Sequence, residues 1–222
     1  MILDRQFNER KSDVEAHFRF LSFIDGIESH KSIPVEYFLN KQKLIVDQQM
    51  QCCVKGLTLV LLYNIVESTV CECLNFIYDA VADDGLTYAE LTDEMRKMWT
   101  QSCNRGGRVE GKLDEINKMP LKVVFKELAT NTSGNIDIRK VYEIFEKHGC
   151  MISDNKREEC SSSFLIVKNK RNLLAHGNVS FSQCGSAYLY KELEKMRQDI
   201  VCFLAIVIDA TKKFVANRKY KR

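Results

Sequence analysis

Apolar residues recur every three or four positions along most of this chain, which is the spacing of one face of an α-helix. The first such stretch runs from Asp4 to about Ser29, and the segment His30–Pro34 is expected to end it. A second helix is predicted to begin near Val35–Asn40. A long central helix is predicted from about Val46 to Ala82, ended by Asp83–Gly85.

The middle of the chain carries weaker patterns. A capping box at Thr87–Glu90 is predicted to open a helix that continues through Trp99, and the segment Asn104–Gly107 is expected to break it. The following stretch is the least regular part of the sequence, with one short helix predicted in it. We expect residues of about 100–135 to form a peripheral helical insertion.

The last third predicts three further elements. Asp137 should cap a helix that closes at His148-Gly149, so His148 is interpreted as a helix-end residue. A second helix is predicted from about Glu159 to His176, followed by a loop, Gly177–Gly185, and a final helix from about Ser186 to Asn217. Because no repeat or interdomain linker interrupts the pattern, residues 1–222 are predicted to form one all-α antiparallel helical bundle.

Composition supports the all-α class and indicates where in the cell the protein is expected. Only two prolines and ten glycines occur in 222 residues, which disfavours a β fold with many turns. The longest apolar runs, near Leu57–Tyr63 and Ile200–Ile208, are shorter than the ~18–20 residues that cross a bilayer, so they are predicted to be core helices. No signal peptide is recognisable at the N-terminus. A cytoplasmic protein without a membrane partner is expected.

Cysteine and charge add two expectations. The nine cysteines are odd in number and lack the paired spacing of zinc sites, so we expect free thiols and neither a metal nor a cofactor. The net charge of +3 is too small to establish a nucleic-acid partner. Basic residues nevertheless gather over Lys212–Arg222 and before the motif described next, where Lys168 and Lys170 are candidate RNA-binding residues. The alternative for the basic C-terminal segment is a solvated tail.

The candidate chemistry lies in Arg171-Asn172-Leu-Leu-Ala-His176-Gly177. An arginine can stabilise a phosphorane, and a histidine can move the proton of a 2′-hydroxyl or of a leaving 5′-oxygen. Arg171 and His176 are about 140° apart around an ideal helix, whereas Asn172 and His176 share a face. Gly177 is predicted to end the helix, so that His176 lies at the negative end of the helix dipole, which favours the imidazolium. The alternative is a structural histidine at a helix end beside a solvated arginine.

A second arginine–histidine pair in the chain shows that spacing alone is weak support for a catalytic site. Arg10 and His17 fit a loose version of the same pattern, but they are predicted to lie on a charged helix surface with no terminator. Arg171 and His176 differ in enclosing the apolar residues 173–175 and in stopping at a glycine. The central helix adds a possible carboxylate partner, because Tyr63, Asn64 and Glu67 are spaced to share one strip of an otherwise apolar helix. Glu67 needs a partner there, and the candidates are Arg171, His176, an unrelated lysine or an interface.

The sequence from Arg171 to His176 resembles the signature of the HEPN superfamily, in which an arginine, usually followed by a polar residue, precedes a histidine by a few positions. Three other stretches are similar to a branch of small stand-alone bacterial HEPN proteins: residues 62–69, residues 134–141, and Ser180-Phe181 after the motif. The resemblance covers most of the chain in the same order. It is weakest over residues 108–131.

The resemblance implies a HEPN-like bundle that forms a two-fold homodimer, with Arg171 and His176 of both subunits meeting at a shared cleft. It implies a metal-independent endoribonuclease that acts as a toxin or defence effector. Arg171 would hold the scissile phosphate of RNA, His176 would transfer a proton, and Asn172 would orient one of them. An antitoxin or defence-system protein would be a further partner.

Two other interpretations stay open on these residues. The bundle could be a HEPN-fold module that only dimerises or docks a partner, or a protein that binds RNA or a nucleotide without cleaving it. Sequence-specific RNA recognition has no support in the sequence. The net charge is modest, and there is no platform of aromatic residues near the motif on which RNA bases could stack.

Overall fold

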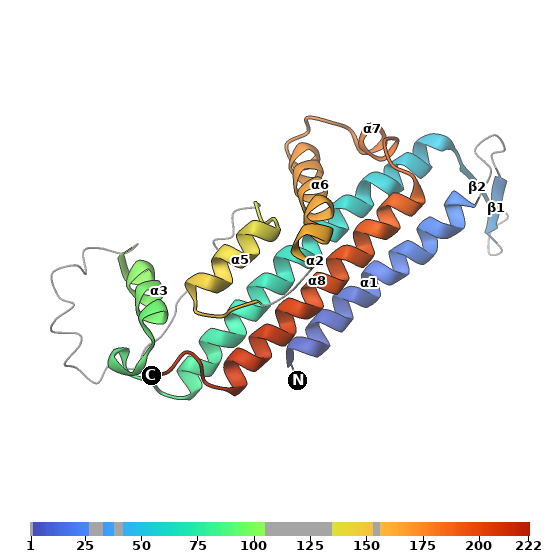
Figure 1. The fold of residues 1–222 in the computed structure, drawn as a ribbon. Coiled ribbons are helices and arrows are strands. Elements are labelled where there is room, and N and C mark those ends of the chain that lie inside the picture. Colours follow the sequence, from blue (N-terminus) through green and yellow to red (C-terminus); the bar gives the residue numbers. More distant parts are fainter. Residues whose placement is uncertain (1, 27–32, 38–41, 105–134, 153–155) are drawn as a thin grey trace.

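The computed structural model describes residues 2–26, 33–37, 42–104, 135–152 and 156–222. Three long helices form the body of this part of the chain and run side by side (Figure 1): α1 (Ile2–Asp25), α2 (Gln48–Asp83) and α8 (Tyr190–Ala216). α2 and α8 run in the same direction, and α1 runs opposite to both. Each helix buries an apolar face against the other two, as Leu21, Leu62 and Phe203 illustrate with no exposed surface. The predicted all-α class is confirmed.

A β-hairpin joins α1 to α2. Its strands, β1 (Ile33–Tyr37) and β2 (Gln42–Val46), are antiparallel and pair Ile33 with Val46. The helix predicted to begin near residues 35–40 is therefore wrong. Branched isoleucine and valine residues favour strands, and Pro34 biases the residue before it towards extended backbone.

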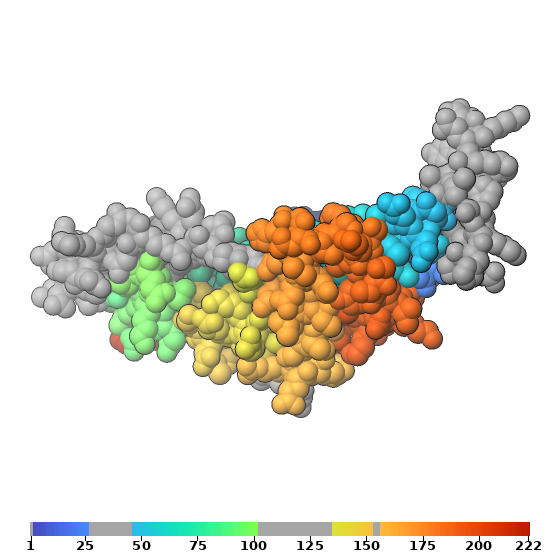
Figure 2. All heavy atoms as spheres, turned by 90° about the horizontal axis from the view of Figure 1, so that it is seen from above, coloured from blue at the N-terminus to red at the C-terminus, as the bar shows by residue number. Residues whose placement is uncertain are grey.

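Shorter elements pack along this body. They are η1 (Tyr88–Glu90), α3 (Asp93–Asn104), α5 (Ile138–Lys147), α6 (Arg157–Ala175) and α7 (Phe181–Gly185). Seen from above, α5, α6 and α7 lie next to one another along one side of the molecule (Figure 2). The Thr87 amide and hydroxyl both donate to the Glu90 carboxylate, at 2.9 and 2.8 Å, but this turn is a single 3-10 turn and a new helix begins at Asp93. The predicted insertion lies mostly outside the described residues.

The predicted loop after the motif contains a helix, α7, whose backbone touches that of α2. A Cβ atom added to Gly185 would lie 1.9 Å from the Cys52 carbonyl oxygen, and one added to Gly56 would lie 2.3 Å from the Phe181 carbonyl oxygen. Only glycine permits two backbones to approach this closely. The loop that leaves α6 is therefore fastened to α2 at its far end.

Most of the basic residues near the C-terminus have acidic partners. Five of them form ion pairs at the surface of the bundle: Lys212 with Asp4, Lys213 with Asp209, Arg218 with Asp84, Lys221 with Glu90, and Arg222 with Asp93. The hydroxyl of the buried Tyr220 also donates to Asp84, at 2.8 Å. The contacts of Arg218, Tyr220, Lys221 and Arg222 join the segment after α8 to the end of α2, to η1 and to the start of α3.

α2 meets the length and composition of a membrane-spanning helix, with a mean hydropathy of 1.5 over its most apolar window. More than half of that window, 56%, is buried inside the bundle. A core helix of a soluble protein has the same composition, so α2 is weak support for a membrane segment.

His148 is a helix-end residue, as predicted, and it is also part of the core. It caps α5 and is 2% exposed. Its Nδ1 donates to the Ile144 carbonyl at 2.7 Å, which leaves Nε2 to accept from the Tyr78 hydroxyl at 2.6 Å. Burial lowers the pKa of His148 and raises the pKa of Tyr78, so both groups are neutral in the folded protein.

Acidification from about pH 7.5 to about pH 5.5 is therefore expected to reduce the free energy of unfolding. An unfolded histidine binds a proton near pH ~6.5, whereas the buried His148 resists protonation to lower pH. The unfolded state thus holds more protons, and stability falls with pH by up to about 1.4 kcal/mol per unit for this group. Urea unfolding at a series of pH values measures it. The variant His148→Gln should show a shallower dependence, and equal slopes in both proteins would contradict the prediction.

Candidate active site at the end of α6

The motif ends α6 in the manner predicted from its glycine. His176 is the C-cap of the helix, and Gly177 follows with a φ of 68°, in the left-handed region that favours glycine. The Gly177 amide donates to the Leu174 carbonyl at 3.1 Å, and the Asn178 amide donates to the Leu173 carbonyl at 2.9 Å. This pair of bonds is a Schellman motif. It fixes the backbone of His176 and leaves the side chain exposed.

Arg171 is held on three sides, one turn before the helix end. Its guanidinium carbon lies 4.6 Å from the centre of the Tyr63 ring, in a cation–π contact. One Nη lies 3.7 Å from a Glu67 carboxylate oxygen, and the other donates to Asn172 Oδ1 at 3.2 Å. Of the partners considered for Glu67, the structure supplies Arg171. Both side chains are 26% exposed, so the pair borders solvent.

The polar strip predicted on α2 divides into two parts. Tyr63 is 1% exposed, and its hydroxyl accepts a hydrogen bond of 3.0 Å from the Ile136 amide. Burial raises the pKa of Tyr63, which keeps the phenol neutral beneath Arg171. Glu67, one turn further along, reaches the same guanidinium. Asn64 instead lies on the exposed surface of α2, so it does not join Tyr63 and Glu67 around Arg171.

The two candidate RNA-binding lysines differ in availability. Lys168 Nζ donates to an Asp137 carboxylate oxygen at 2.7 Å, and the two side chains are only 15% and 11% exposed. Burial acts to raise the pKa of Asp137, but hydrogen bonds from Lys168 and from the Lys140 amide hold it below its usual range. Lys168 is therefore engaged in fastening α6 to the start of α5. Lys170 is half-buried, and no ion pair joins it to another of the described residues.

Arg171 and His176 face different ways within one chain. Arg171 turns towards α2, where Tyr63 and Glu67 hold it. The His176 side chain belongs to an exposed face of α6 that also carries Leu165, Asn169 and Leu173, four positions within about 80° of one another on an ideal helix. The predicted angular separation of the two residues is therefore present in the structure.

The similarly spaced pair on α1 has a different environment. Arg10 forms an ion pair with Glu72, and His17 Nε2 lies 2.8 Å from the Thr58 hydroxyl. That hydroxyl already donates to the Val54 carbonyl, so His17 is the donor. His17 had been predicted to lie on a charged helix surface, but it is half-buried between α1 and α2. Burial lowers its pKa. It does not end a helix.

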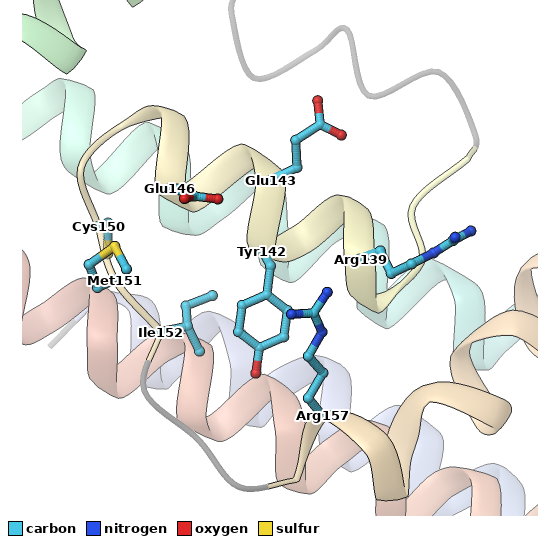
Figure 3. A pocket seen from close by; sticks show the side chains of 8 residues that line it. All are labelled: Arg139, Tyr142, Glu143, Glu146, Cys150, Met151, Ile152 and Arg157. Atoms are coloured by element: carbon cyan, nitrogen blue, oxygen red, sulfur yellow. The ribbon is translucent and has the colours of Figure 1, made fainter.

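A cavity of about 580 Å³ lies apart from the motif, between α5 and the start of α6 (Figure 3). Arg157 projects over the Tyr142 ring there, with 4.7 Å between the guanidinium carbon and the ring centre. The remaining lining carries both charge signs: Arg139, Glu143, Glu146, Cys150, Met151 and Ile152. No motif residue lines it. Among the residues that the structure describes, no cluster of three His, Cys, Asp or Glu side chains is placed to hold a metal ion.

A family model for HEPN_MAE_28990-like HEPN matches residues 3–220, nearly the whole chain. The chain belongs to the HEPN superfamily. Searches of curated proteins and of solved structures found no match. HEPN domains are all-α and are often ribonucleases. The family resemblance carried by the sequence from Arg171 to His176 is thus confirmed.

The segment Asn135-Ile136-Asp137 also contacts the candidate site. The family resemblance had included residues 134–141, but no role at the site had been predicted for Asn135 or Ile136. Asn135 Oδ1 accepts a hydrogen bond of 3.0 Å from the Asn172 side-chain amide. Only Asp137 had a local signal, as a helix cap, and it does accept from the Lys140 amide at 3.0 Å. The contacts with Tyr63 and Asn172 span many residues, so no spacing rule could reveal them.

Proposed function

We propose that this HEPN protein is a metal-independent endoribonuclease in which Arg171 binds the scissile phosphate and His176 transfers a proton. The supporting observation is the arrangement at the end of α6, where Arg171 is fixed by Tyr63, Glu67 and Asn172 while His176 stays exposed one turn away. Groups oriented before the substrate arrives can stabilise a transition state without reorganising.

In the proposed reaction, the 2′-oxygen of the ribose bonds to phosphorus while the bond from phosphorus to the 5′-oxygen breaks. The 2′-hydroxyl gives its proton to a base, and the leaving 5′-oxygen takes a proton from an acid. The products are a 2′,3′-cyclic phosphate and a 5′-hydroxyl. Arg171 would offset the charge that gathers on the phosphoryl oxygens. Its separation of 3.7 Å from Glu67 is longer than a hydrogen bond, so a phosphate can compete for it.

One histidine cannot serve as base and acid in the same step, so we further propose that two copies of the chain contribute one each. The exposed face of α6 is the proposed contact, because it carries Leu165 and Leu173, which are 44% and 38% exposed, alongside His176. The proposal also includes a cytoplasmic toxin or defence role with an antitoxin or defence-system partner, for which the support is the resemblance seen in the sequence.

The direct test is incubation of the purified protein with total RNA in EDTA, followed by analysis of the product ends. Fragments ending in 2′,3′-cyclic phosphate would support the mechanism. Intact RNA, or fragments ending in a 3′-hydroxyl, would overturn it.

The variant Leu173→Glu is expected to shift the protein from dimer to monomer and to reduce RNA cleavage in parallel. A carboxylate on the α6 face would have to be desolvated, without a partner, in the proposed interface. Sedimentation velocity and a cleavage assay on the same samples measure both effects. Phe23→Glu is a matched control, because Phe23 is also an exposed apolar residue, at 60%, but lies on α1. A monomeric Leu173→Glu protein with full activity would contradict the shared site.

The second candidate function is a HEPN-fold module that binds RNA or a partner without cleavage. The observation that favours it is the Arg171–Glu67 pair, in which the candidate phosphate ligand already has a carboxylate partner. RNA that is retained by the wild-type protein in a binding assay, yet stays intact, would distinguish this function from the first.

A further inference from the structure

Three consecutive residues before α5 each hold a different residue around the motif. Asn135 accepts from the Asn172 side chain at 3.0 Å, the Ile136 amide donates to the Tyr63 hydroxyl at 3.0 Å, and Asp137 accepts from Lys168 at 2.7 Å. Two of the residues so held, Asn172 and Tyr63, are direct contacts of Arg171. The segment thus holds the residues that surround the guanidinium.

The Asn172 amide is oriented by two partners, Asn135 on one side and Arg171 on the other. Its NH₂ group donates to Asn135 Oδ1, and its oxygen is therefore turned towards Arg171, from which it accepts at 3.2 Å. A reversed amide would present two donors to Arg171, which has no acceptor. The Asn135 oxygen therefore influences the position of the Arg171 guanidinium indirectly, through Asn172.

We propose that Asn135 is a positioning residue of the candidate active site, which sets the orientation of Arg171 through Asn172. The inference rests on the proposed ribonuclease function. Asn135 itself touches neither Arg171 nor, in the proposed mechanism, the reacting atoms. Its role is to keep the Asn172 oxygen directed at the arginine.

Burial distinguishes this role from a contribution to the fold. Asn135 is exposed, and a hydrogen bond at an exposed site contributes little to stability, because water replaces it when it is lost. Asp137, by contrast, is 7% exposed, caps α5 and pairs with Lys168, so its loss should unfold the segment. Asn135 can therefore be changed with the fold intact.

The variant Asn135→Ala is expected to lower kcat for RNA cleavage about 10- to 100-fold, with KM nearly unchanged and no change in Tm. Asn135→Asp retains an acceptor oxygen for Asn172, so it should restore kcat. Arg139→Ala is the matched control, because Arg139 belongs to the same stretch and its side chain is 76% exposed. Its ion-pair partner is Asp137, and it has no bond to Asn172. Control activity should equal that of the wild type.

Side-chain NMR gives a readout that does not depend on cleavage. In ¹⁵N-labelled protein, the Asn172 NH₂ and Arg171 Nε resonances should shift in Asn135→Ala and return towards wild-type positions in Asn135→Asp. An unchanged kcat in Asn135→Ala, an Asn135→Asp protein as impaired as Asn135→Ala, or unshifted resonances would each overturn the inference. A wild-type protein that cleaves no RNA would instead overturn the proposed function, and the NMR comparison would still decide whether Asn135 orients Arg171.

Discussion

Alanine in place of His176 or of Arg171 is expected to reduce RNA cleavage by at least about 100-fold. His176→Ala removes the group that transfers the proton. Arg171→Ala removes the cation that offsets charge on the phosphoryl oxygens. Cleavage of a labelled RNA in EDTA, under single-turnover conditions, measures both losses. Arg171→Lys should recover little of the activity, because an ammonium lacks the planar fork that meets a phosphate and Glu67 together.

Arg10 and His17, the similarly spaced pair on α1, provide matched controls for these variants. Arg10→Ala and His17→Ala remove the same side-chain types from a place that the proposed mechanism does not use. Both should retain wild-type cleavage, provided that circular dichroism shows them to be folded. Equal activity in wild type, His176→Ala and Arg171→Ala would mean that the site lies elsewhere or that the RNA is cut by a contaminant.

Alanine at Gly185 is expected to lower the free energy of unfolding by about 3 kcal/mol. Its Cβ atom would lie 1.9 Å from the Cys52 carbonyl oxygen and 2.6 Å from the Gly56 amide nitrogen. Both obstacles are backbone atoms inside α2, so the clash can be relieved only by moving α7 away from that helix. Urea unfolding monitored by circular dichroism measures the loss.

The control for Gly185→Ala is Gly85→Ala. Gly85 has a φ of 62°, so alanine there is strained, but nothing lies within 4 Å of the added atom. The expected cost is about 1 kcal/mol, from backbone strain alone. If the two substitutions cost the same, the contact between α7 and α2 is looser than its geometry indicates. Because α7 anchors the loop after His176, Gly185→Ala should also lower RNA cleavage.

Local signals in the sequence predicted the parts of the site that depend on local physics. Gly177 marks the end of α6 because it adopts a left-handed backbone, and Asp137 marks the start of α5 because its carboxylate accepts an amide hydrogen bond. These effects act within one helical turn. For the same reason the family signature from Arg171 to His176 could be interpreted before any fold was known.

Predictions of contacts between distant parts of the chain were incomplete or were wrong. The partner of Glu67 could be narrowed only to several candidates, because the way α6 crosses α2 depends on the whole core. Asn135 lies in a stretch that the family resemblance included, but its role could not be predicted, because its bond to Asn172 joins residues 37 positions apart. Three of the basic residues assigned to solvent or phosphate have acidic partners far away in the sequence: Asp4 on α1, Asp84 at the end of α2 and Asp93 at the start of α3.

The position of α8 beside both α1 and α2 has a consequence for synthesis on the ribosome (Figure 1). When α6 emerges, the apolar faces that α1 and α2 present to α8 still lack their cover, and the motif has been translated before the core that orients it is complete. A nascent chain at that stage exposes surface that chaperones recognise. We expect Arg171 and His176 to take up their arrangement only after α8 has followed, so any activity of the proposed site would have to wait until translation has passed the last long helix.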